Sequence, residues 1–164
     1  MKFRYKKGDI LLYKKKTLVS KIISWFTGSE YTHTAMYVGN GNIIDAWWGG
    51  VNLRHLSEDE GKYEITVVRH KTAKPSDLEL AVQWSLQQIG AGYDYLGIIG
   101  IGLYILGISK KNWYDDRNRY WCSELNIDAF IHANQPTDAN ENTFKVSPGD
   151  VHKDSHFREM VTIR

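Results

Sequence analysis

One stretch constrains the fold more than any other: "YTHTAMYVGNGNIIDAWW", residues 31–48, in which two apolar runs flank Asn40-Gly41. Both runs are rich in residues that favour strands, and Asn-Gly is a dipeptide that favours tight turns between antiparallel strands. The stretch therefore predicts a β-hairpin, and with it an antiparallel sheet.

Other segments predict the rest of an α+β fold. Further strands are expected at 8–13, 63–70 and 159–163. Apolar residues at helical spacing predict helices at 17–26, 75–90 and 122–134. In the second of these helices, we expect Ser76 and Glu79 to form a capping box behind Pro75. The pattern predicts an antiparallel sheet packed against helices.

The length of the chain and its single cysteine limit the possibilities further. A chain of 164 residues and 18.9 kDa suits one domain, residues 1–164, with one core. One cysteine fits a reducing compartment and excludes a disulfide scaffold. The apolar segment 96–108 is too short to span a bilayer as a helix, so we expect it to be at least partly buried.

Charge is uneven along the chain although its net value is only +2. Residues 1–21 carry eight lysine or arginine side chains against Asp9 alone. This region is either a solvated face or a surface for peripheral contact with anionic lipid or wall polymer. No nucleic-acid motif is present, so no nucleic-acid partner is expected. The lysines and Asp9 also interrupt any secretion signal, which makes the cytoplasm the default expectation.

Cys122, in "RYWCSEL" (119–125), stands at the start of a predicted helix. Unpaired N–H groups and the helix dipole stabilise negative charge there, so a thiol ionises more easily. A cysteine hydrolase also needs a base and a group that orients the base. The alternative is an inert cysteine in the core.

His33 and Asp45 are polar residues inside the two apolar runs of the hairpin. With a two-residue turn at Asn40-Gly41, paired residue numbers sum to 81 and Asp45 points away from the side of His33. A three-residue loop with Gly41 as a left-handed bulge residue makes the sum 80, and the side chains then share a face. We predict the second arrangement. A core histidine and a turn aspartate are the alternatives.

These residues, taken in order, resemble a known superfamily. The matching pieces are Gly8-Asp9-Ile10, His33 followed by Tyr37-Val38-Gly39-Asn40-Gly41, Asp45-Ala46, and Cys122-Ser123-Glu124-Leu125. The set resembles the NlpC-like papain-fold superfamily. Because the histidine precedes the cysteine, it is similar to the circularly permuted branch, the YiiX-like and lecithin:retinol acyltransferase-like proteins. Ser147-Pro148-Gly149-Asp150-Val151 resembles a C-terminal segment of YiiX-like members.

The resemblance implies a permuted papain-like fold and a role for each residue. Cys122 would be the nucleophile, His33 the base and Asp45 the group that orients it. Gly90-Ala91-Gly92-Tyr93 resembles a Gly-x-x-Tyr motif, which would place Tyr93 at the oxyanion or substrate. Tyr93 lies 29 residues before Cys122, a long interval that an insertion around 96–108 would explain. Trp47 either lines the substrate cleft or packs in the core.

The implied activity is hydrolysis of an amide bond through a Cys-His-Asp triad and a thioester intermediate. The substrate would be a peptide, an isopeptide or a peptidoglycan stem peptide. Two alternatives remain: a lipid acyltransferase or thioesterase using the same thiol, and a non-catalytic binding module. No cofactor is expected. His152 and His156 are spaced as a metal pair on a helix, but only Asp150 and Asp154 could complete it, so no metal is expected.

Overall fold

A six-stranded sheet forms the centre of the computed structural model, which describes residues 3–14, 28–47, 49–59, 61–94, 119–139 and 143–164. The strands, in sheet order, are β4 (Gly50–His55), β3 (Asn42–Trp47), β2 (His33–Gly39), β1 (Ile10–Lys14), β5 (Glu64–His70) and β8 (Phe157–Ile163). Each neighbouring pair is antiparallel. The predicted α+β architecture is confirmed.

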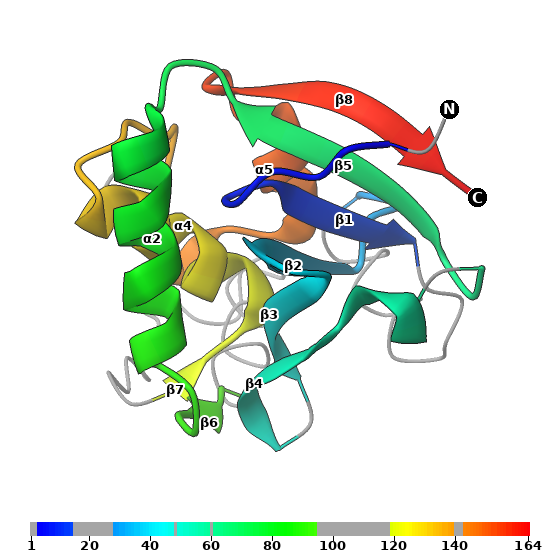
Figure 1. The fold of residues 1–164 in the computed structure, drawn as a ribbon, viewed down its shortest axis with the longest axis horizontal. Helices are drawn as coiled ribbons and strands as arrows, with labels where there is room; N and C mark the ends of the chain where they lie inside the picture. The colour runs from blue at the N-terminus through cyan, green and yellow to red at the C-terminus, as the bar shows by residue number, and fades with distance from the viewer. Residues whose placement is uncertain (1–2, 15–27, 48, 60, 95–118, 140–142) are drawn as a thin grey trace.

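Helices cover one side of this sheet. They are α2 (Pro75–Gln87), α4 (Cys122–His132) and α5 (Pro148–Lys153). There are also two short 3₁₀ turns, η2 (Thr143–Lys145), which contacts α4, and η1 (Leu56–Glu58), whose Leu56 packs on the other face. Figure 1 shows α2 and α4 side by side, and α4 packs on β2 and β3. A separate parallel pair joins β6 (Gly92–Tyr93) to β7 (Arg119–Tyr120).

The alternation of side chains along the strands divides the core between the two faces of the sheet. Even-numbered residues such as Leu12, Met36 and Ile44 pack with Leu125 and Phe130 of α4. Odd-numbered residues such as Leu11, Ala35 and Ile43 form a second cluster on the opposite face. Helix α4 is therefore held to β2 and β3 by buried apolar contacts, which fixes the position of its first residue, Cys122.

Most predicted elements are confirmed, although α5, β6 and β7 were not predicted, and two further corrections follow. The prediction missed β4, where Gly49 and Gly50 precede a run with little alternation. Helix α2 is capped at Lys74, whose backbone N–H donates to Asp77, because Pro75 occupies the first helical position. Ser76 and Glu79 do not form the predicted box, and Glu79 pairs with Lys7.

Two expectations lie outside the described residues, the helix at 17–26 and the burial of 96–108. Within the described part of the chain, no helix combines the length and apolar character that crossing a membrane requires.

Candidate active site

The β2–β3 hairpin sets the relation between His33 and Asp45. Asn40 and Gly41 have φ values of 54° and 79°, so they form a tight two-residue turn closed by the pair Gly39 and Asn42. The register then shifts between Tyr37 and Gly39, and beyond this bulge paired numbers sum to 80, as in Met36 with Ile44. The prediction that paired residue numbers sum to 80 is therefore correct. The cause, however, is a bulge on β2 and not a third loop residue at Gly41.

His33 and Asp45 consequently lie on one face and form a direct hydrogen bond. His33 Nε2 lies 2.7 Å from Asp45 Oδ2, and both side chains are almost completely buried. The prediction that they share a face of the hairpin is confirmed. A buried carboxylate on one ring nitrogen fixes the orientation and tautomer of the imidazole, leaving Nδ1 as the ring nitrogen that can exchange a proton.

Asp45 has a second partner that the sequence did not reveal. Arg54 on β4 donates to the same carboxylate, with Nη2 2.7 Å from Oδ2 and Nε 3.3 Å from Oδ1. Its Nη1 lies 2.6 Å from Asp59 Oδ2, just beyond η1. Burial raises the pKa of Asp45, but His33 and Arg54 more than compensate and hold that pKa well below its usual range. Asp45 is therefore an anion throughout the neutral range.

Cys122 is the first residue of α4 and lies beside His33. Burial raises the pKa of its thiol, but the charge of His33 and a hydrogen bond with that imidazole lower it. The backbone and side chain of Thr34 also hydrogen-bond the sulfur, and the pKa of Cys122 is lowered overall. Glu124 accepts a hydrogen bond from the backbone N–H of Trp121 and so caps the helix.

Thr34 is held in place by α4 itself. Asn126 Nδ2 donates to Thr34 Oγ1 over 2.8 Å, and both residues are fully buried. Because a hydroxyl has one hydrogen, this bond leaves the hydrogen of Thr34 for the sulfur. Thr34 and Asn126 were not among the predicted site residues. Their signal in the sequence was weak: one polar residue beside His33 and one a helical turn after Cys122.

Two aromatic rings enclose the imidazole of His33. The ring of Tyr13, its neighbour on β1, lies 5.5 Å away, and the ring of Trp47 lies 4.7 Å away in an edge-on orientation. Trp47 is half-buried at the end of β3. It therefore contacts His33, whatever further part it has in lining a cleft.

The long interval between Tyr93 and Cys122 is closed by the β6–β7 pair. Tyr93 is paired with Tyr120, two residues before Cys122, and the N–H of Asp94 donates to the carbonyl of Tyr120. The structure thus brings the backbone of Tyr93 close to the start of α4. A role for the Tyr93 hydroxyl at the oxyanion remains a prediction.

The comparisons with known proteins agree with this arrangement. The chain matches the family described as "Permuted papain-like amidase enzyme, YaeF/YiiX, C92 family" over residues 4–161. The chain belongs to this family. The crystal structure of metalloprotein YiiX from Escherichia coli O157:H7 has a TM-score of 0.73 at 18% identity, covering 97% of this chain and 98% of that one. This likeness confirms the permuted papain-like fold of the C92 family.

One curated member of the C92 group is also similar. It is the "Probable lipoprotein peptidase YaeF" of Escherichia coli (strain K12), 22% identical over 171 residues. The match covers 89% of this chain but 62% of YaeF, so the chain corresponds to only part of that relative.

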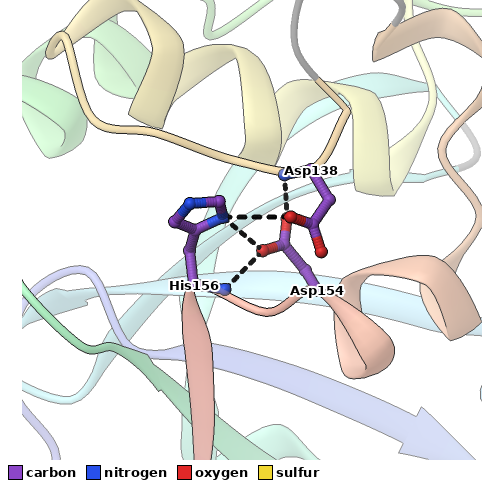
Figure 2. Close-up of side chains that lie close together, drawn as sticks. All are labelled: Asp138, Asp154 and His156. Atoms are coloured by element: carbon purple, nitrogen blue, oxygen red, sulfur yellow. Dashed lines mark hydrogen bonds and ion pairs between the residues drawn. The ribbon is translucent and has the colours of Figure 1, made fainter.

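Away from Cys122, this C92 chain has a second group of titratable side chains. Figure 2 shows Asp138, Asp154 and His156 pointing toward one another, with His156 Nδ1 3.1 Å from Asp154 Oδ1 and 3.2 Å from Asp138 Oδ1. Two carboxylates and an imidazole are a donor set that can bind a divalent metal. The four carboxylate oxygens, however, already accept hydrogen bonds from Ser155 and from the backbone of Asp138 and His156. These bonds explain the group without a cation.

The predicted helical pair of histidines is not formed. Helix α5 ends at Lys153, so His152 is on the helix and His156 lies beyond it. His152 contacts Glu159 and the ring of Tyr31 instead.

We expect Asp154→Ala to lower the free energy of unfolding by about 1–3 kcal/mol, because it leaves two backbone N–H groups without their acceptor. The measurement is urea denaturation in the presence of EDTA, so that no divalent cation contributes. A loss of stability seen only when a divalent cation is added would contradict the hydrogen-bond explanation and indicate a metal site.

Proposed function

We propose that the chain is a cysteine hydrolase that cleaves amide bonds of peptide substrates through Cys122, His33 and Asp45. One observation carries the proposal: a thiol of lowered pKa beside an imidazole whose other nitrogen is bonded to a buried carboxylate. Membership of a permuted papain-like amidase family supports the same reaction class.

The first half of the proposed reaction forms a thioester. Sγ of Cys122 attacks the carbonyl carbon, and Nδ1 of His33 holds the proton that the thiol has lost. As the tetrahedral intermediate collapses, the C–N bond breaks and His33 gives that proton to the leaving amine. Asp45 stabilises the imidazolium and keeps the ring in place.

The second half hydrolyses the thioester. His33 takes a proton from water, the oxygen attacks the acyl carbon, and the C–S bond breaks, after which the thiol and imidazole again share one proton. The N–H of Cys122 is not used by the helix, since it belongs to the first residue of α4, and is suited to stabilise the oxyanion. The hydroxyl of Tyr93 is proposed as a second donor.

Peptides are the preferred substrate class. The relative YaeF is named a probable lipoprotein peptidase, which supports a peptide or lipopeptide amide. Isopeptides and peptidoglycan stem peptides have the same amide group and belong in the same substrate panel.

We expect wild-type protein, incubated with a p-nitrophenyl ester, to gain one acyl group on Cys122, seen by intact-protein mass spectrometry. The ester acylates the sulfur and releases p-nitrophenolate, so no other reagent is needed. Cys122→Ala should show no adduct and no cleavage of peptidyl aminomethylcoumarin amides. Ser123→Ala is the matched control, because its hydroxyl donates to the carbonyl of Val146 over a 2.5 Å bond instead of facing the sulfur.

The same assay separates the alternatives. An adduct that disappears only when phospholipid vesicles are added, with formation of an acylated lipid, would identify an acyltransferase. A wild-type protein that forms no adduct and releases p-nitrophenolate no faster than Cys122→Ala would contradict the hydrolase and favour a binding module.

A further inference from the structure

We propose that Arg54 is a positioning residue for His33 and that Asp59 limits its effect, so that the two together set the basicity of the imidazole. The inference rests on the proposed function, in which His33 is the base. Neither residue touches the reacting atoms; both act through Asp45.

Geometry puts Arg54 in direct competition with His33 for one oxygen atom. His33 Nε2 and Arg54 Nη2 each lie 2.7 Å from Asp45 Oδ2. The sheet register explains the contact: Arg54 pairs with Ile43 and Asp45 with Asn52, so Arg54 and Asp45 are diagonal neighbours on one face. Two nitrogens of the guanidinium hold the carboxylate, which fixes its plane as well as its position.

Asp59 and Tyr13 complete the network around Arg54. Asp59 lies 2.6 Å from Arg54 Nη1 and is buried, whereas the side chain of Arg54 is 22% exposed. Burial raises the pKa of Tyr13 well above its usual value, and the nearby negative charge of Asp59 raises that pKa further. Tyr13 is therefore a neutral phenol whose ring lies 5.5 Å from that of His33.

Charges alternate along this path when the thiolate and imidazolium are formed. The order is Cys122 negative, His33 positive, Asp45 negative, Arg54 positive and Asp59 negative. Arg54 draws Asp45 away from the imidazolium and so lowers the basicity of His33, while Asp59 draws Arg54 away from Asp45 and restores part of it.

The titratable and charged groups that face His33 come from every element around it. Among the described residues they are Cys122 at the start of α4, Asp45 on β3, Tyr13 on β1 and, through Asp45, Arg54 and Asp59; Glu124 adds a charge in the first turn of α4. Of these, Arg54 and Asp59 can be changed without altering any atom in contact with the imidazole. They are therefore the cleanest probes of its basicity.

The test is the pKa of His33, measured by NMR titration of its ring in the intact protein, for wild type, Arg54→Gln and Asp59→Asn. Arg54→Gln removes a positive charge and should raise the pKa of His33 by about 1 unit. Asp59→Asn removes a negative charge and should lower that pKa by a smaller amount. Arg54→Lys keeps the charge but not the two-nitrogen grip, so it should restore the pKa while leaving kcat reduced. It also serves if Arg54→Gln does not fold.

Arg69→Gln is the matched control. Arg69 grips Asp9 with two bonds of 2.6 and 2.8 Å on the same sheet, and Asp9 precedes β1 at the end away from Tyr13. This variant should lose stability but leave the pKa of His33 unchanged. If Arg54→Gln and Asp59→Asn also leave that pKa unchanged, the proposal is wrong and the network is only structural.

Failure of this inference can be told apart from failure of the proposed function. The titration needs no substrate, so it reports on Arg54 even if wild-type Cys122 forms no acyl adduct. Shifts of opposite sign in a wild-type protein that shows neither an adduct nor release of p-nitrophenolate would support the control of His33 basicity and contradict the hydrolase. An acyl adduct on Cys122 without any shift in the pKa of His33 would support the hydrolase and contradict the role of Arg54 and Asp59.

Discussion

Replacing His33 by alanine is expected to raise the pKa of Cys122 and to lower amide hydrolysis by about 10²–10⁴-fold. An opposite charge within about 4–6 Å shifts a pKa by roughly 1–3 units, so the imidazolium is the largest favourable contribution to thiolate formation. Without the imidazolium, burial still raises the pKa of the thiol, and only Thr34 and the N-terminus of α4 are left to lower it. The measurement is the rate of alkylation by iodoacetamide as a function of pH. In His33→Ala, the rise of this rate should move to higher pH.

His70→Ala provides the control for His33→Ala. His70 is also buried, and it accepts hydrogen bonds from the backbone of Thr72 and Ala73. Its loss should lower stability but leave the alkylation profile unchanged. If Cys122 of the wild type reacts at pH 6 to 7 no faster than a model thiol, and His33→Ala does not alter the profile, Cys122 is a core cysteine.

Asp45→Asn is expected to slow turnover by up to about 10⁴-fold while leaving Cys122 open to alkylation. The amide has the same shape but presents no anion to His33, so the ring loses its preferred tautomer and the imidazolium its stabilising charge. Steady-state kinetics and intact-protein mass spectrometry after alkylation measure the two effects separately. Equal loss of turnover and of alkylation would contradict an orienting role for Asp45.

The same substitution should cost about 3 kcal/mol of stability at neutral pH, because Arg54 keeps only Asp59 as a partner. The pKa of Asp45 is lowered in the folded protein, so its contribution is fully present above the unfolded value of about 3.9 and is lost as pH falls through the folded value. The part of the stability difference between wild type and Asp45→Asn that comes from ionisation of Asp45 should thus be constant down to about pH 5 and shrink below about pH 4. Urea denaturation across this range would show it. A difference that does not shrink below about pH 4 would contradict the lowered pKa of Asp45.

Local patterns were sufficient to predict the hairpin and the helix that begins at Cys122. Asn40-Gly41 identified the turn, and apolar spacing identified the face of α4 that contains Leu125 and Phe130. His33 and Asp45 were correctly predicted to share a face, although the extra residue that causes this was assigned to the loop. A bulge on β2 has the same effect on register, and nothing in the local sequence distinguishes the two positions.

Contacts between distant segments could not be predicted in this way. Arg54 reaches Asp45 because β4 pairs with β3, and β4 begins at the second of two glycines and has no clear alternation. Asn126 meets Thr34 only because α4 packs on β2. The structure therefore adds the groups that surround the predicted residues, which single-sequence patterns do not encode.

The position of Cys122 at the junction of α4 with β2 makes its reactivity dependent on folding. His33 and Thr34 are synthesised about ninety residues before the thiol, and an unfolded chain has neither of them, nor a helix N-terminus, beside the sulfur. A nascent or misfolded chain thus exposes an ordinary thiol with a pKa of about 8.5, mostly protonated in the cell. Oxidants and stray acyl donors react with thiolates, so the chain is protected from premature modification on the ribosome until α4 docks.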